Sequence, residues 1–148
     1  MPRGETTQFG VIDYEEAAVV HFPAGLPAFD EERRFLLIEQ TETAPVVFLQ
    51  SLRTPSLVFL ALPARLVDSA FQLTLSDDDR AALNLTQAEP VEGAGLISLA
   101  LLKVRGGQAV TANLLAPVVI AAESRRALQV LQPESGYRVD MPVGEAVA

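Results

Sequence analysis

Histidine is the first residue type to consider, because it can serve acid–base or nucleophilic chemistry and this chain has only one. His21 stands in the apolar stretch 19–23, and a Ser-His-Asp hydrolase would have to use it with a carboxylate. We favour a structural histidine, because the sequence offers it no evident catalytic partner. A zinc site is disfavoured, since zinc takes ligands rich in His and Cys and the chain has no cysteine. The alternative is a small β-barrel hydrolase or ligand-binding enzyme that uses His21 and a carboxylate.

The acidic residues form no catalytic pattern. The run 77–79 is all aspartate and follows Ser76, which is typical of a helix start with an N-cap and an acidic first turn. The alternating spacing and central glycine of a calcium loop are missing. Adjacent acids such as Glu15 and Glu16 would point to opposite faces of a strand. We therefore predict no catalytic residue, no metal ligand and no cofactor, and a protein that is not an enzyme.

One loop is a better candidate for a site. The stretch 21–31 contains two prolines and a glycine, and it ends in a run of acids. Rigid apolar side chains beside charge are a common way to build a binding hot spot. The alternative is that its phenylalanines pack into one end of the fold. The predicted partner-binding residues are Phe22, Leu26 and Phe29 as apolar anchors and Asp30, Glu31 and Glu32 as steering charges.

A second candidate surface combines Asn113 with Pro117. Proline cannot donate to a strand ladder, so Pro117 predicts a kink or strand end. A strand edge broken in this way can accept an incoming segment by strand addition. Asn113 can instead complete the broken ladder from within, and we slightly prefer that interpretation.

The elements that must position these residues are short β-like runs separated by Gly, Pro and Asx residues. Strands are predicted at 17–22 and 35–40. The runs 46–52 and 57–62 predict one hairpin, and 95–104 and 108–115 predict another across a two-residue turn at Gly106 and Gly107. Short helices are predicted after Ser76 and at 63–68. The fold class that follows is mainly β: a small antiparallel β-barrel or sandwich-like single domain with one or two short helices.

Length and composition place the chain among soluble, cytoplasmic proteins of one domain. Its 148 residues are 49% hydrophobic and 20% charged, enough for a packed core. The net charge of −8 argues against direct binding of nucleic acid, and acidic residues would favour a basic partner. No apolar run reaches the roughly 18 residues of a membrane span. We expect one domain over 1–148 that is a monomer when free, with flexible ends at 1–6 and 143–148.

Six segments stand out along the chain: His21–Phe29 (HFPAGLPAF), Phe48–Leu52 (FLQSL), Leu75–Leu83 (LSDDDRAAL), Thr111–Ile120 (TANLLAPVVI), Arg125–Leu131 (RRALQVL) and Tyr137. In this order they resemble the flagellar assembly factor FliW family. The resemblance covers about residues 7–142. It differs at Ala28, where the family usually has Gly, at Ala121, where it usually has Asn, and over 138–143, which departs from the family's usual ending. Ala28 suggests that this loop can do without a positive φ.

The resemblance implies a regulator that acts through protein partners. FliW-like proteins bind newly made flagellin in the cytoplasm. Once flagellin is exported, they are released to bind CsrA, an RNA-binding regulator that represses flagellin translation. By this resemblance the chain would bind flagellin and, when free of it, antagonise CsrA without touching RNA itself.

Overall fold

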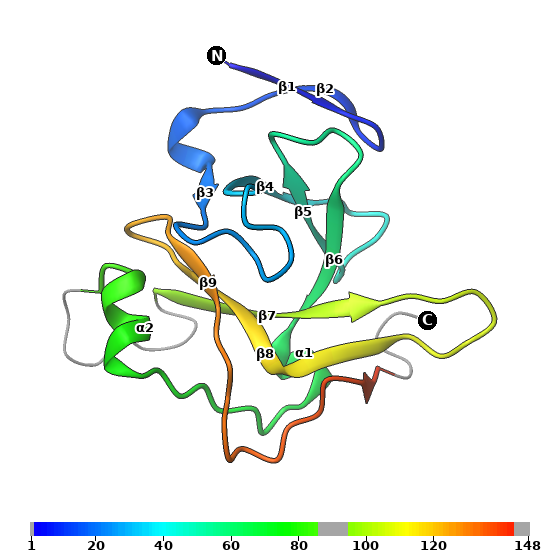
Figure 1. The fold of residues 1–148 in the computed structure, drawn as a ribbon. Coiled ribbons are helices and arrows are strands. Elements are labelled where there is room, and N and C mark those ends of the chain that lie inside the picture. The colour runs from blue at the N-terminus through cyan, green and yellow to red at the C-terminus, as the bar shows by residue number, and fades with distance from the viewer. Residues whose placement is uncertain (1, 86–94, 144–148) are drawn as a thin grey trace.

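The computed structural model describes residues 2–85 and 95–143 (Figure 1). These residues form ten strands, two α-helices and one 3-10 helix. In chain order the elements are β1 (Arg3–Thr6), β2 (Gly10–Asp13), η1 (Glu16–Ala18), β3 (Val20–His21), β4 (Arg34–Glu39), β5 (Val47–Ser51), β6 (Val58–Pro63), α1 (Ala64–Val67), α2 (Asp77–Ala82), β7 (Leu96–Lys103), β8 (Thr111–Ala121), β9 (Ala127–Gln129) and β10 (Met141–Pro142).

Eight strands form one antiparallel sheet that is nearly closed into a barrel. The order along it is β10-β8-β7-β6-β5-β4-β3, and β9 pairs with β8. The two ends of the sheet meet where His21 bridges Arg126 and the His21 N–H donates to the Arg125 carbonyl over 2.8 Å. The separate β1–β2 hairpin lies above the barrel (Figure 1). The predicted mainly β fold is therefore confirmed.

Both predicted hairpins are present. In the first, β5 pairs with β6 from Val47 opposite Ala61, and in the second, β7 pairs with β8 from Leu96 opposite Ala121. The predicted turn at Gly106 and Gly107 is present, because the Gln108 N–H donates to the Arg105 carbonyl across them and Gly107 has a φ of +76°. The turn does not follow the ladder directly, since regular pairing ends at Lys103 and Thr111.

Helix α2 begins where its capping residues predict, whereas the first predicted strand is only partly present. Ser76 and Asp79 form a capping box at the start of α2, with hydrogen bonds of 3.1 and 3.0 Å. The strand predicted at 17–22 is wrong in its first half, because the chain makes the helical turn η1 there and only Val20–His21 pair with β4.

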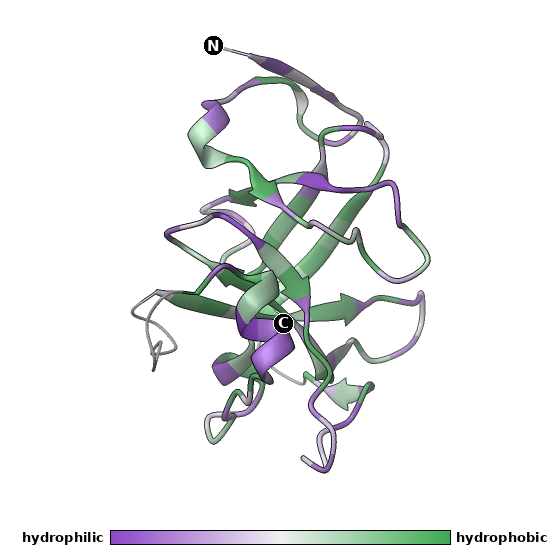
Figure 2. Cartoon of the chain, turned by 60° about the vertical axis from the view of Figure 1, so that its left-hand side comes forward, coloured by the Kyte–Doolittle hydropathy of each residue, from purple (hydrophilic) through white to green (hydrophobic). Residues whose placement is uncertain are grey.

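The apolar side chains fill the barrel and continue below it. Figure 2 shows hydrophobic colouring along the barrel strands and hydrophilic colouring on many loops. The main cluster inside the barrel joins residues of β3 to β9, including Val20, Phe35, Leu49 and Ile120. A second cluster beside it contains Leu62, Phe71 and Leu114.

The chain ends differ in part from the prediction. Residues 3–6, predicted to be a flexible end, form β1 and pair with β2 from Arg3 opposite Asp13. Val143 is buried, and residues 144–148 of the other predicted flexible end lie outside the described residues. Among the described residues, no helix has the length and apolar character needed to cross a membrane.

Candidate partner-binding site

The candidate loop, residues 22–32, is folded around a tight turn. The Phe29 N–H donates to the Leu26 carbonyl over 2.7 Å, so Pro27 and Ala28 are the two central residues. Ala28 has a φ of 69°. A type II turn has this arrangement, with proline first and a positive φ second. The prediction that Ala28 spares the loop a positive φ is wrong: the turn keeps the left-handed conformation and places an alanine in it.

Gly25 is required by both its conformation and its surroundings. Its φ is +71°, in the left-handed region. A Cβ on Gly25 would lie 2.5 Å from the backbone oxygen of Asp30, so the loop closes directly over this glycine. No other residue type fits there without moving the backbone.

Two of the three predicted apolar anchors are core residues. Phe22 and Leu26 are 1% and 3% exposed, and both belong to the barrel cluster. Phe22 packs edge-on against Phe35 with ring centroids 5.2 Å apart. The expectation that the loop displays Phe22 and Leu26 is therefore wrong, because burying these side chains is what attaches the loop to the barrel end.

Phe29 is the anchor that reaches the surface. It is 40% exposed, while one side of its ring packs edge-on against Phe59 at a centroid distance of 5.6 Å. An aromatic ring that is supported on one side and open on the other can bury further area against a partner at little cost in side-chain freedom. Its predicted role in binding is therefore sterically possible.

The three acids of the loop have different surroundings. Glu32 is 8% exposed and accepts hydrogen bonds from the hydroxyls of Ser51 and Thr54, at 2.5 and 2.6 Å. It ties the loop to the β5–β6 turn and is not available for steering. Asp30 and Glu31 are exposed, as predicted steering residues must be.

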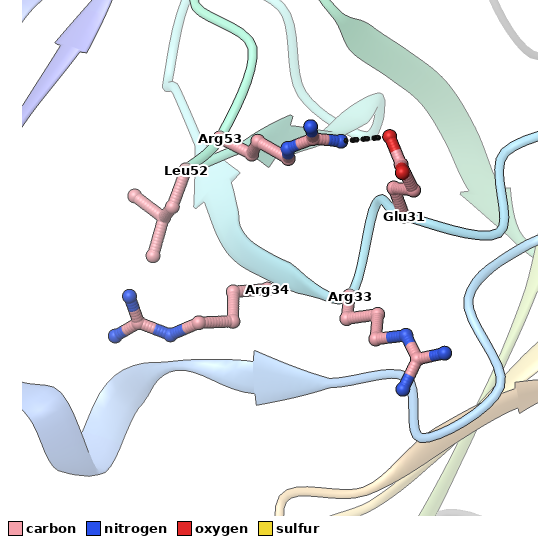
Figure 3. A pocket seen from close by; sticks show the side chains of 5 residues that line it. All are labelled: Glu31, Arg33, Arg34, Leu52 and Arg53. Atoms are coloured by element: carbon pink, nitrogen blue, oxygen red, sulfur yellow. Dashed lines mark hydrogen bonds and ion pairs between the residues drawn. The ribbon is translucent and has the colours of Figure 1, made fainter.

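Three arginines lie beside these acids, and sequence reasoning did not assign them to the site. Arg33, Arg34 and Arg53 line a small pocket of about 180 Å³ together with Glu31 and Leu52. Figure 3 shows their side chains fanning apart, with Arg53 directed at Glu31 over 2.7 Å. That hydrogen bond and the charge of Glu31 raise the pKa of the Arg53 guanidinium. Arg33 and Arg34 adjoin the acids in the sequence, whereas Arg53 is brought in only by the fold.

Arg34 also has an acidic partner, Glu16 of η1. Two of the three arginines are thus paired, and the pocket beside Glu31 carries both charges. The predicted steering acids therefore have basic neighbours.

At the second candidate surface, Asn113 and Pro117 form hydrogen bonds with other groups of the same chain. The Asn113 side-chain oxygen accepts from the Ala116 N–H over 3.0 Å, and the Pro117 carbonyl accepts from the Val130 N–H over 2.8 Å. The register between β7 and β8 shifts between Leu99 and Leu101, opposite this segment. Pro117 is buried and Asn113 half-buried, which supports the interpretation that Asn113 completes the interrupted ladder. Partner binding at these two residues stays a prediction.

His21 has an exposed side chain and contributes to the fold through its backbone at the barrel closure. Apart from bonds between strands, the only hydrogen bond that involves His21 among the described residues is the one donated by its backbone N–H. Within residues 2–85 and 95–143, no group of three or more His, Asp or Glu side chains is arranged to hold a metal ion.

The fold and loop define a small, nearly closed β-barrel protein with a rigid loop that presents one aromatic side chain. A crystal structure of the flagellar assembly factor FliW matches it with a TM-score of 0.84 and 29% identity, over 96% of both chains. Among the similar proteins called flagellar assembly factor FliW, that of Pseudothermotoga lettingae is 34% identical over 90% of this chain and 83% of its own. That of Bacillus subtilis is 27% identical over 94% of both.

The family model for the FliW protein matches residues 3–143. The chain belongs to the FliW family, and the resemblance noted in the sequence is confirmed.

Several residues of the matching segments have structural roles. Gln50 is buried and donates to the carbonyls of Ser51, Pro55 and Leu57. Gln129 donates to the Ala116 carbonyl over 2.9 Å, across the β8–β9 pair. These amides satisfy backbone carbonyls at the end of β5 and in the irregular part of β8, so their presence in the matching segments has a structural explanation.

Proposed function

We propose that this chain is a protein-binding regulator of flagellum assembly. It binds flagellin and, when free of flagellin, binds the translational regulator CsrA and relieves its repression of flagellin translation. Membership of a family of flagellar assembly factors supports the flagellar role. In this proposal the protein acts in the cytoplasm as a monomer that pairs on demand, and it works by occupying its partners without catalysis.

The observation that carries the binding proposal is the exposed half of Phe29. The buried side chains of Phe22 and Leu26 and the close-fitting Gly25 hold this ring in a fixed position. A pre-ordered aromatic anchor loses little conformational entropy when it binds. The neighbouring acids Asp30 and Glu31 fit a partner with basic surface, which an RNA-binding regulator must have.

The first test is Phe29→Ala, with binding to purified CsrA and to flagellin measured by titration calorimetry. Since truncation of a central aromatic anchor commonly costs 2 kcal/mol or more, we expect the Kd for at least one partner to rise roughly 30-fold. Leu131→Ala is the control, because Leu131 is a large exposed apolar residue outside this loop. Equal affinity of both variants and the wild type, with unchanged thermal unfolding, would refute the placement of the anchor.

The charge component is tested by the double variant Asp30→Asn and Glu31→Gln, which leaves the buried Glu32 intact. We expect a slower association rate with CsrA at low salt and a smaller difference at high salt, because exposed charges steer encounter more than they hold a complex together. A rate difference that is independent of salt would exclude steering by these acids. Adding flagellin beforehand should reduce the amount of CsrA bound.

A further inference from the structure

A groove of about 690 Å³ lies between the β1–β2 hairpin and the barrel. It shares no residue with the candidate loop, residues 22–32. The hairpin side contributes Phe9, Ile12 and Tyr14, and the barrel side contributes residues 36–40 of β4 and its end. Phe9 is fixed by edge-on packing against Phe48 of β5 at 5.2 Å. The groove therefore has an apolar, supported wall on one side and a strand on the other.

That strand has an unpaired edge. β4 pairs with β5 along its whole length, but it pairs with β3 only at Arg34 and Phe35. Before Val20 the chain coils into η1, so β3 does not continue alongside the rest of β4.

Hydrogen bonds at the start of β4 show which backbone groups point to that edge. The Arg34 carbonyl accepts from Leu52 on the β5 side, and the Arg33 carbonyl accepts from Phe22 on the β3 side. Backbone groups alternate in direction along an antiparallel strand. Leu36 and Ile38 consequently bond to β5, whereas the N–H and C=O groups of Leu37 and Glu39 face away from β5. Within the described residues, no hydrogen bond outside the β4–β5 ladder involves those two backbones.

The groove is also acidic. Asp13, Glu15 and Glu39 line it, and its lining contains no lysine or arginine. Asp13 is paired with the exposed Arg3 over 3.1 Å, which leaves Glu15 and Glu39 without an ion-pair partner among the described residues. A basic ligand is therefore favoured over an acidic one.

We propose that the groove binds an extended segment of a partner protein in which apolar and basic side chains alternate. The segment adds to β4 as a strand, hydrogen-bonding to the backbones of Leu37 and Glu39. One face of it packs against Phe9, Ile12 and Tyr14, and its basic side chains lie beside Glu15 and Glu39. An extended segment is required because a helix has no free backbone groups to offer β4. This site does not rest on the function proposed above.

The most direct test is amide hydrogen exchange by NMR, using a short peptide of alternating valine and lysine as the probe. At saturation, exchange at Leu37 and Glu39 should slow at least tenfold. Exchange at Leu36 and Ile38 should change little, because these amides already bond to β5. Uniform protection of all four residues, or none, would overturn strand addition.

Two substitutions of Glu39 separate the contribution of its side-chain charge to peptide binding from that of its backbone N–H. Glu39→Gln keeps the N–H, whereas Glu39→Pro also removes it from the unpaired edge, where proline is tolerated. We expect Glu39→Gln to weaken peptide binding roughly threefold and Glu39→Pro to weaken it roughly tenfold beyond that. Equal affinities of the two variants would refute the backbone contact. If Glu39→Pro fails to fold, a peptide N-methylated on its bonding edge tests the same contact in the wild-type protein.

The preference of the groove for a basic peptide is tested with two double variants that remove the same charge inside and outside the groove. Glu15→Gln combined with Glu39→Gln should weaken binding, while Glu123→Gln combined with Glu134→Gln, which removes the same charge outside the groove, should not. Tighter binding of a valine–glutamate peptide or of a helical basic peptide would overturn the proposed occupant. So would light scattering that shows a dimer of this chain dissociated by the peptide, because the edge would then belong to a second copy.

Discussion

Gly25 and Gly10 have nearly the same backbone conformation in opposite surroundings. Their φ values are +71° and +70°, but a Cβ on Gly25 would meet the Asp30 backbone, whereas a Cβ on Gly10 would have nothing within 4 Å. Gly25 belongs to the candidate loop, whose residues pack closely against one another. Gly10 begins β2 in the hairpin that borders the groove. Close packing within the loop therefore excludes any side chain at position 25. The hairpin has space for a side chain at position 10.

The largest expected effect is that of Gly25→Ala. The left-handed conformation costs an alanine about 1–2 kcal/mol, and forced overpacking adds roughly 1–3 kcal/mol. We therefore expect the free energy of unfolding, measured with urea, to fall by about 3 kcal/mol. Gly10→Ala is the matched control and should lose only the conformational part. Similar losses in both variants would show that the contact over Gly25 relaxes freely.

The next effect concerns the two neighbouring glutamates of the loop. Glu32→Ala removes a buried carboxylate that accepts from Ser51 and Thr54, and we expect it to cost about 2–3 kcal/mol. Glu31→Ala removes an exposed pair with Arg53, and we expect it to change the free energy of unfolding much less, because solvent screens exposed ion pairs. Urea unfolding of the two variants measures the difference between their losses in the free energy of unfolding. A loss at Glu31 as large as that at Glu32 would contradict the burial assigned to these side chains.

The glutamates also show where prediction from the sequence stops. Asp30, Glu31 and Glu32 look equivalent in a linear run, and only the approach of the β5–β6 turn separates the buried Glu32 from the others. The same limit applies to Phe22, Leu26 and Phe29, because apolar residues of a loop can face either way.

Elements that depend on neighbouring residues in the sequence were predicted more reliably than the burial of side chains in the loop. The N-cap at Ser76 with its acidic first turn and the β5–β6 hairpin depend on neighbouring residues, and both were predicted correctly. The apolar runs predicted a mainly β fold but left a barrel and a sandwich open, and the closure at His21 and Arg126 decides for the barrel. The groove beside β4 could not be predicted, because it depends on β3 ending early and on the hairpin lying across the barrel.

The smallest expected effect is that of Ala28→Gly, and its sign makes it informative. Glycine relieves about 1–2 kcal/mol of left-handed strain but increases the freedom of the unfolded chain by about 0.4–1 kcal/mol. We expect a net gain of about 0.5 kcal/mol, which corresponds to a rise in Tm of roughly 1–2 °C for a chain of this size.

Scanning calorimetry of Ala28→Gly beside Ala24→Gly measures this gain, because Ala24 is in the same loop but has no positive φ. Ala24→Gly should lower the Tm slightly through the unfolded state alone. If Ala28→Gly lowers it too, the turn at Pro27 carries no strain, and Ala28 fits its position as well as the glycine usual in the family. A rise with unchanged partner affinity would show that the turn supports the fold and leaves Phe29 where it was.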